Sequence, residues 1–277
     1  MIRTRGLAGL TACILVVGSG TGCVLRPPSN ATAGEREPLQ LRAVPATPFR
    51  AALQGRIRGS AGRARFAVGL GAVPPDLRVD LFHPVSGETI LSVGVDGNAL
   101  RAVWPGSAEC FEGRPSTEVM GWILGIAVPP AELLALLDGS IVPAGSAEVV
   151  ARRPLTGGQQ VRIDLAAPGD GTRWRAVVDR RRRGGAREGV RYGNDGVEIR
   201  VSYPRWSAGT AGFAGHPEAI RLRVQRPRLR LDLDVREWAA GGPPRAALLP
   251  RLPAGCSQLT EGELTRRGPG WASRRRR

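Results

Sequence analysis

The chain has 277 residues and a formal net charge of +16, and all 40 of its basic residues are arginine. Arginine without lysine, together with 38 glycines, is typical of a GC-rich genome, so the charge alone does not indicate a nucleic-acid-binding protein. Only two histidines occur, and no spacing of His, Cys and Glu suggests a metal site, which argues against a histidine-based metal centre.

The first 22 residues have the three parts of a secretory signal peptide. Residues 1–5 are short and basic, residues 6–17 are apolar, and residues 18–22 are small. The apolar run is shorter than the roughly 20 residues that span a bilayer, which favours a signal peptide over a transmembrane anchor. We therefore expect residues 1–22 to direct export.

Cys23 follows this segment directly. Thr21-Gly22-Cys23 resembles the lipobox of bacterial lipoproteins, in which the cysteine thiol receives a diacylglyceryl group. The resemblance implies that Cys23 is lipidated, and two or three acyl chains anchor a protein stably at about 0.8 kcal/mol per buried methylene. The next residue is Val24, whereas an aspartate there retains lipoproteins in the inner membrane of enterobacteria. We expect a lipid-anchored protein on the periplasmic face of the outer membrane.

The segments on either side of the domain are polar and lack periodicity. Residues 23–45 are rich in Pro, Ala, Arg and Glu and read as a flexible tether, and residues 265–277 read as a basic disordered tail. This leaves 46–264 as one domain, predicted to be a monomer. Its basic surface can contact anionic lipid headgroups, at about 1 kcal/mol per arginine, or can simply be solvated. An exported chain rarely meets nucleic acid, so no nucleic-acid partner is expected.

Four cysteines occur. Cys13 lies in the predicted signal peptide and Cys23 is the predicted lipid site. Cys110 and Cys256 remain as one candidate disulfide in an oxidising compartment, although the sequence leaves open whether they pair.

Apolar and polar residues alternate with a period of two through much of the domain. Leu229, Leu231, Leu233 and Val235, for example, are separated by Arg or Asp. The same alternation occurs in residues 66–70, 77–81, 91–95, 161–165, 197–203 and 220–224. It is typical of antiparallel strands with one buried face. With the turn signals between them, these segments predict a meander of about ten or eleven strands.

Two segments have helical spacing instead. Residues 118–126 follow Ser116 and Thr117, either of which can cap a helix, and Pro129-Pro130 begins a second helix that ends before Gly139. Their apolar stripes consist of Val119, Trp122, Ile123 and Ile126 in the first, and Leu133, Leu136 and Leu137 in the second. A sheet with one apolar face needs a cover, so we predict two short helices as a lid. The periodicity leaves open whether the interior beneath them is filled, the usual case, or open to lipid.

Short motifs spread over residues 49–259 resemble the LolA/LolB lipoprotein-localisation family, including its uncharacterised LolA-like lipoprotein relatives. The motifs, in the order of the family, are residues 54–59, Pro84-Val85-Ser86-Gly87, Leu124-Gly125, Val128-Pro129-Pro130, residues 136–139 and residues 252–255. The resemblance implies a mainly β fold: an incomplete, strongly curved antiparallel barrel whose open side is closed by helices.

The resemblance also implies a function and site residues. In LolB an apolar cavity holds acyl chains, and a loop residue that corresponds to Val85 touches the membrane. The cavity or lid residues implied here are Trp122, Ile123, Ile126, Leu133, Leu136 and Leu137. We therefore expect an outer-membrane lipoprotein that binds acyl chains or lipoproteins and assists their delivery, with a LolA-type periplasmic carrier as partner. The alternative is a structural or envelope-assembly lipoprotein with the same fold and no cargo.

The sequence gives little support for catalysis. His83 and His216 each precede a proline in an expected loop, and no nucleophile-elbow pattern is present. Neither histidine lies in a pattern that a catalytic base requires, so we expect no enzymatic activity and no cofactor.

Overall fold

The computed structural model describes residues 47–59, 62–141, 148–155, 157–166, 171–179, 185–194, 196–208, 215–226 and 228–267. The predicted signal peptide, Cys23, the predicted tether and residues 268–277 lie outside these ranges. No helix within them is both long and apolar enough to cross a membrane.

One sheet contains all fourteen strands. They are β1 (Phe49–Gly59), β2 (Gly62–Val73), β3 (Asp76–Phe82), β4 (Thr89–Asp96), β5 (Ala99–Trp104), β6 (Glu109–Gly113), β7 (Glu148–Pro154), β8 (Gln160–Ala166), β9 (Arg173–Asp179), β10 (Ala186–Gly193), β11 (Gly196–Trp206), β12 (Pro217–Val224), β13 (Leu229–Ala240) and β14 (Ser257–Gln258). Their order in the sheet is β14-β6-β5-β4-β3-β2-β1-β13-β12-β11-β10-β9-β8-β7.

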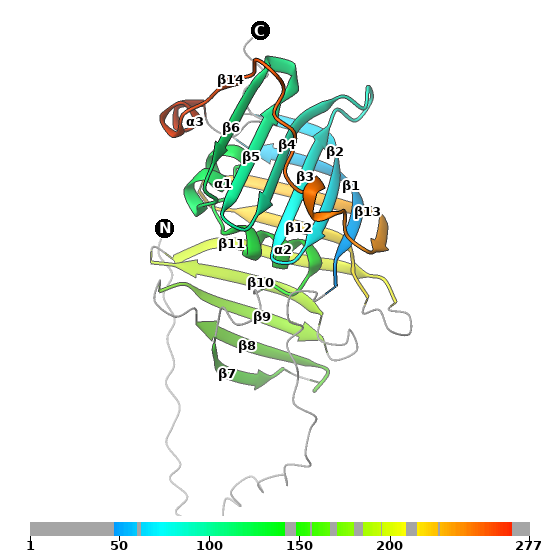
Figure 1. Ribbon diagram of the computed structural model, residues 1–277. Helices are drawn as coiled ribbons and strands as arrows, with labels where there is room; N and C mark the ends of the chain where they lie inside the picture. The colour runs from blue at the N-terminus through cyan, green and yellow to red at the C-terminus, as the bar shows by residue number, and fades with distance from the viewer. Residues whose placement is uncertain are drawn as a thin grey trace, which may run out of the picture. The chain divides into compact units, whose positions relative to one another are not determined.

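Two antiparallel meanders, β1 to β6 and β7 to β13, make up this sheet. Pairing of β1 with β13 joins them, and β14 adds in parallel to β6. Strands β14 and β7 are the two edges, so the curved sheet does not close on itself (Figure 1). The predicted mainly β, incomplete barrel is therefore confirmed, but the predicted ten or eleven strands are too few.

Strands β6, β7 and β14 carry little alternation of apolar and polar residues. Strand β7 is exposed along almost its whole length, so no apolar face marks it. Strand β14 has only two residues, and in β6 the adjacent Cys110 and Phe111 are both buried. An apolar–polar alternation cannot be recognised in a strand whose two faces are both exposed or both buried, or in a strand of two residues.

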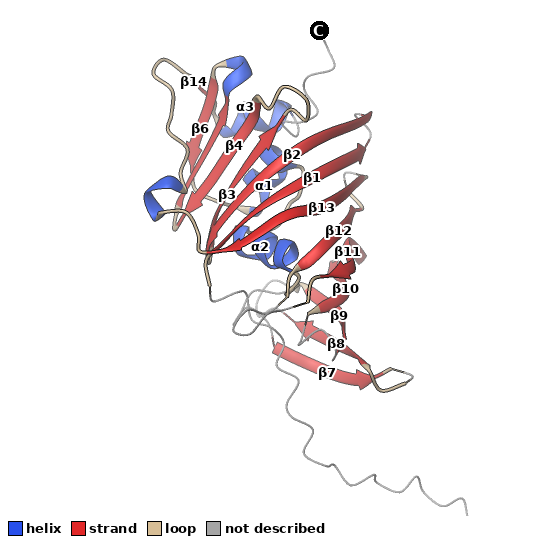
Figure 2. Ribbon diagram, turned by 90° about the vertical axis from the view of Figure 1, so that its right-hand side faces the viewer, coloured by secondary structure: helices blue, strands red, loops and turns tan. Residues whose placement is uncertain are grey.

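The two predicted helices lie between β6 and β7 in the chain and pack on the concave face of the sheet (Figure 2). In α1 (Thr117–Leu124) the Ser116 hydroxyl accepts a hydrogen bond from the Val119 amide at 3.2 Å, as the capping signal predicts. Helix α2 (Pro130–Asp138) ends at Gly139, whose φ of 85° is left-handed. Both predicted helices are confirmed, but α1 ends at Leu124 and is capped by Gly125, so Ile126 of the predicted stripe follows the helix.

A third helix, α3 (Glu261–Arg267), was not predicted. It packs against α1, and within it only Leu264 is buried, so it shows no apolar stripe. Helix α3 extends to Arg267, so the folded domain continues beyond residue 264, the end predicted from the sequence.

The segment 241–256, here called the C-terminal strap, crosses the outer face of the sheet. A Cβ on Gly94 of β4 would lie 2.1 Å from the Leu248 carbonyl oxygen, so only glycine admits the strap there. Arg245 forms ion pairs with Asp76 and Asp96, and Figure 1 shows the strap in orange beside β3 and β4.

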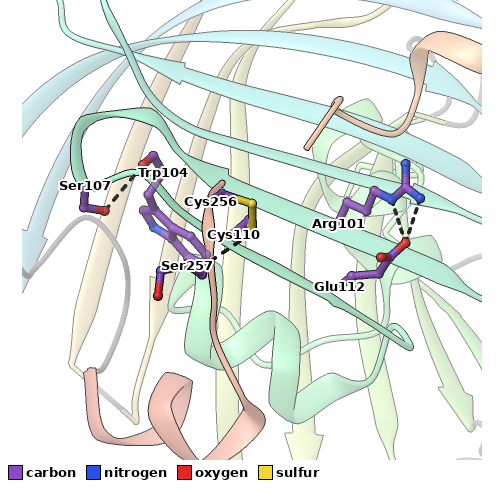
Figure 3. The surroundings of a disulfide bond; sticks show 7 residues. All are labelled: Arg101, Trp104, Ser107, Cys110, Glu112, Cys256 and Ser257. Carbon is purple, nitrogen blue, oxygen red and sulfur yellow. Dashed lines mark hydrogen bonds and ion pairs between the residues drawn. A yellow bond between two sulfur atoms is a disulfide. The ribbon is translucent and has the colours of Figure 1, made fainter. Parts of the chain in front are cut away.

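At the end of the strap, Cys256 is joined to Cys110 of β6 in a disulfide, with 5.9 Å between the two Cα atoms (Figure 3). The bond precedes β14 and ties the C-terminal segment to the sheet edge, where the Leu259 amide also donates to the Cys110 carbonyl at 2.7 Å. The two cysteines that the sequence leaves as a candidate pair are therefore bonded.

Candidate functional site

An apolar pocket lies between the two-helix lid and the concave face of the sheet. Its volume is about 80 Å³, and every side chain that lines it is apolar. The lining residues are Ile57 of β1, Phe66 and Val68 of β2, Val79 and Leu81 of β3, Leu124 and Ile126 at the end of α1, Leu133 and Leu137 of α2, and Leu229, Leu231 and Leu233 of β13. Apart from Ile57, the strand members are the inward residues of the predicted alternation, which is why they share one face.

Three of the six residues predicted for the cavity or lid line this pocket: Ile126, Leu133 and Leu137. The other three do not. Ile123 and Leu136 are completely buried in the hydrophobic core, and Trp122 packs against that core half-buried. Helical spacing identifies the covered face of a helix, but it does not separate pocket from core.

Sequence reasoning missed Leu124 and all of the strand residues as members of the site. The strand residues were visible as apolar alternation, but only the pairing of β1 with β13 brings the two meanders together around the pocket. That pairing joins segments about 180 residues apart in the chain, as the contact of Leu53 with Val235 illustrates.

The ring of Phe66, at the side of the pocket, packs over Gly55 of the neighbouring strand β1. It is the cross-strand partner of Gly55, and a Cβ on Gly55 would come within 2.3 Å of the Phe66 ring. The absence of a side chain at Gly55 therefore lets the ring lie flat across β1. Because Phe66 is only partly buried, its ring position helps to set the size of the pocket.

Polar contacts fasten α2 to the second meander. The Glu132 carboxylate of α2 pairs with the Arg191 guanidinium of β10 at 2.9 Å, and both side chains are about nine-tenths buried. Arg191 also pairs with Glu198 of β11. A buried pair of this kind is costly to break, because removal of one partner leaves an uncompensated charge.

A second polar contact holds the C-terminal turn of α2. The Tyr203 hydroxyl, fully buried on β11, donates to the Leu136 carbonyl at 2.8 Å. The Ser140 amide, which would bond that carbonyl in a longer helix, bonds the Asp138 side chain instead. Burial raises the pKa of Tyr203 well above its usual value, so the phenol stays protonated as a donor.

The attachment of the lid is therefore asymmetric. Toward β10 and β11, α2 is held by an ion pair and a buried hydrogen bond, whereas toward β1, β2, β3 and β13 it meets apolar side chains across the pocket. A site of this composition can bind an apolar group by dispersion and desolvation. It offers no polar side chain to orient a reacting group.

Val85 lies in the loop between β3 and β4 and is 89% exposed, the highest value among the large apolar side chains described. The loop is held by its own backbone and by His83, whose Nδ1 accepts from the Ser86 amide at 3.2 Å. The predicted role of Val85 at a membrane stays a prediction.

The second histidine lies near the end of the sheet. His216 stacks on Trp238, with 4.8 Å between the ring centroids, and its Nδ1 lies 3.0 Å from the Ser207 hydroxyl. The same hydroxyl contacts the backbone of His216, so these contacts join the end of β11 to the start of β12. Within the described ranges no group of three or more His, Cys, Asp and Glu could hold a metal ion.

Scans against family models and curated proteins gave no match for this sequence. Solved structures are similar in fold. A LolA superfamily protein from Nitrosomonas europaea has a TM-score of 0.52 at 12% identity, over 75% of this chain and 92% of that chain. An outer membrane lipoprotein-sorting protein domain from Vibrio parahaemolyticus has a TM-score of 0.51 at 9% identity, over 85% of this chain and 95% of that chain. The chain therefore has the fold of LolA superfamily proteins and of lipoprotein-sorting domains.

Proposed function

We propose that this protein is an outer-membrane lipoprotein that takes acyl chains, or the acylated ends of lipoproteins, into the apolar pocket beneath α1 and α2 and assists their delivery to the outer membrane. The observation that carries the proposal is the pocket itself: twelve apolar side chains, from four strands, two helices and the residue Ile126 after α1, converge under a helical lid. The sequence features at Cys23 support an anchored protein, and a LolA-type periplasmic carrier is the expected donor of cargo.

The proposal requires the pocket to enlarge when it binds. Its volume of about 80 Å³ is well below the roughly 300–1,000 Å³ of ordinary ligand pockets. Phe66, Leu81, Leu124 and Leu137 are only partly buried, so their side chains can rotate outward. The polar bonds to β10 and β11 would hold α2 on one side while the apolar side parts from β1, β2 and β3.

The small volume favours a second candidate function. A structural or envelope-assembly lipoprotein with a filled interior would need no larger cavity and would act through its surface. The two candidates differ in one measurable respect, which is whether the folded protein carries lipid.

The test is mass spectrometry of lipid extracted from the full chain purified as the Cys23→Ser variant, which removes the covalent anchor as a source of acyl groups. The acyl-binding function predicts co-purifying lipid and saturable binding of a fluorescent fatty acid. A folded protein that carries no lipid and binds no fatty acid would support the structural function instead.

Two variants at the same position of the pocket sharpen this test. Gly55→Ala should push the Phe66 ring into the pocket and weaken binding of the probe, because the new methyl takes the place of the ring. Phe66→Ala should enlarge the pocket and strengthen binding. Gly69→Ala is the matched control, since its Cβ would lie 3.3 Å from Phe82 and does not touch the pocket.

A further inference from the structure

The strand register aligns five arginines in one row across the outer face of the sheet. Arg63 of β2 is the cross-strand partner of Arg58 of β1, and Arg58 is the partner of Arg230 of β13. Arg230 is in turn the partner of Arg223 of β12, and Arg223 of Arg200 of β11. Neighbouring strands lie about 4.8 Å apart, so the row extends roughly 19 Å across five strands.

A second row lies two residues further along the same strands. It contains Arg65, Arg56, Asp232 and Arg221, in that order from β2 to β12. Asp232 also pairs with Arg230 at 3.3 Å. The two rows together, here called the arginine face, hold eight arginines and this one aspartate, and all the arginines except the half-buried Arg230 are exposed.

The first row places like charges opposite one another on adjacent strands. Like charges directly opposite one another on adjacent strands repel, and this row contains four such pairs in succession. Elsewhere the chain places an acid opposite arginine, as in the cross-strand pairs of Arg175 with Asp164 and Arg101 with Glu112. The first row itself contains only arginine, and Asp232 of the second row pairs with its central member, Arg230.

An exposed apolar side chain lies at the same end of the sheet. Phe82 of β3 is the partner of Ala67 of β2, so the β3–β4 loop continues toward the level of Arg65 and Arg63. That loop carries Val85, which is 89% exposed. Cationic side chains and an exposed apolar one at the same end of a sheet are what an anionic bilayer surface attracts, through its headgroups and its acyl boundary. A nucleic acid would bind the arginine side chains through its phosphates, but it would have no contact to make with the exposed Val85.

We propose that the arginine face is a docking surface for a bilayer rich in anionic phospholipid, beyond the membrane contact that the family resemblance already implies for the Val85 loop. The guanidinium groups would donate paired hydrogen bonds to headgroup phosphates. The contact would orient the domain on a membrane independently of the covalent anchor. It does not depend on the pocket beneath the lid, which opens on the other face of the sheet.

The test is co-sedimentation of the full chain with vesicles, with Cys23→Ser in every protein so that no covalent lipid contributes. The vesicles contain phosphatidylcholine alone, or phosphatidylcholine and phosphatidylglycerol in equal parts. The test variant is Arg58→Gln/Arg200→Gln/Arg223→Gln. The control is Arg152→Gln/Arg153→Gln/Arg251→Gln, which removes the same charge from exposed positions outside the arginine face.

The proposal predicts binding to the anionic vesicles that weakens with salt and is largely absent from phosphatidylcholine alone. Each arginine near an anionic surface strengthens binding by about fivefold. Loss of three should therefore lower the vesicle partition coefficient of the test variant by up to roughly a hundredfold, and that of the control variant much less. The melting temperature of the test variant should equal or exceed that of the parent, since repulsion between facing arginines is removed. Equal partitioning of the two variants would overturn the proposal, and so would binding of duplex DNA through this face without binding of anionic vesicles.

Discussion

Replacement of Tyr203 by phenylalanine tests how the lid helix is held. The variant keeps the buried ring and removes only the hydroxyl that donates to the Leu136 carbonyl at 2.8 Å. This carbonyl lies in the last turn of α2, where the amide that would otherwise bond it is engaged by Asp138. An unsatisfied buried acceptor costs about 1–3 kcal/mol, so we expect a loss near 2 kcal/mol in the free energy of unfolding.

The measurement is urea or thermal unfolding followed by circular dichroism. For a domain of this size a loss of about 2 kcal/mol lowers the melting temperature by roughly 4–8 °C. Tyr192→Phe is the matched control, because that hydroxyl is half-exposed and accepts only a long bond of 3.4 Å from Arg175. If both variants melt together within error, the Tyr203 hydroxyl does not hold α2, and the hydrogen-bonded half of the asymmetric attachment is refuted.

Three further predictions concern the ends of the chain. Cys110→Ser should lower the free energy of unfolding by about 2–4 kcal/mol under oxidising conditions, and two alkylatable thiols in the exported wild-type domain would contradict the disulfide with Cys256. A hydrogen bond from Arg267 holds the pKa of Glu109 below its usual value, so this pair stabilises the fold at neutral pH and the stabilisation is lost as the pH falls through the lowered pKa. The difference in melting temperature between wild type and Glu109→Gln should therefore disappear in acid, and a difference that grows in acid would be inconsistent with this sign. Radiolabelled palmitate should label wild type but not Cys23→Ser, and equal labelling of both would rule out lipidation there.

Much of the fold could be predicted because the relevant signals are local. The alternation of Leu229, Leu231 and Leu233 reports one covered face, and these residues are buried as expected. The caps of α1 and α2 could be read from Ser116 and Gly139, since each acts on a backbone group within a few residues. Features of this kind need no knowledge of distant partners.

The remainder depends on pairings between distant segments. The pocket combines β2 and β3 with β13, and the arginine row appears only when Arg58 is placed opposite Arg230. Helix α3 and the C-terminal strap have no period of their own, and their positions come from contacts with α1 and with the outer face of the sheet. Strand register and packing between distant segments are set by tertiary contacts, which cannot be deduced from the local pattern of a single sequence.

The most direct test of the central claim is photocrosslinking with a diazirine-bearing palmitate, followed by peptide mass spectrometry to locate the attached residues. If acyl chains enter beneath the lid, labels should concentrate on lining residues such as Phe66, Leu133 and Leu137, and excess palmitate should compete them away. Labels confined to the outer face of the sheet, or insensitive to competition, would contradict the account.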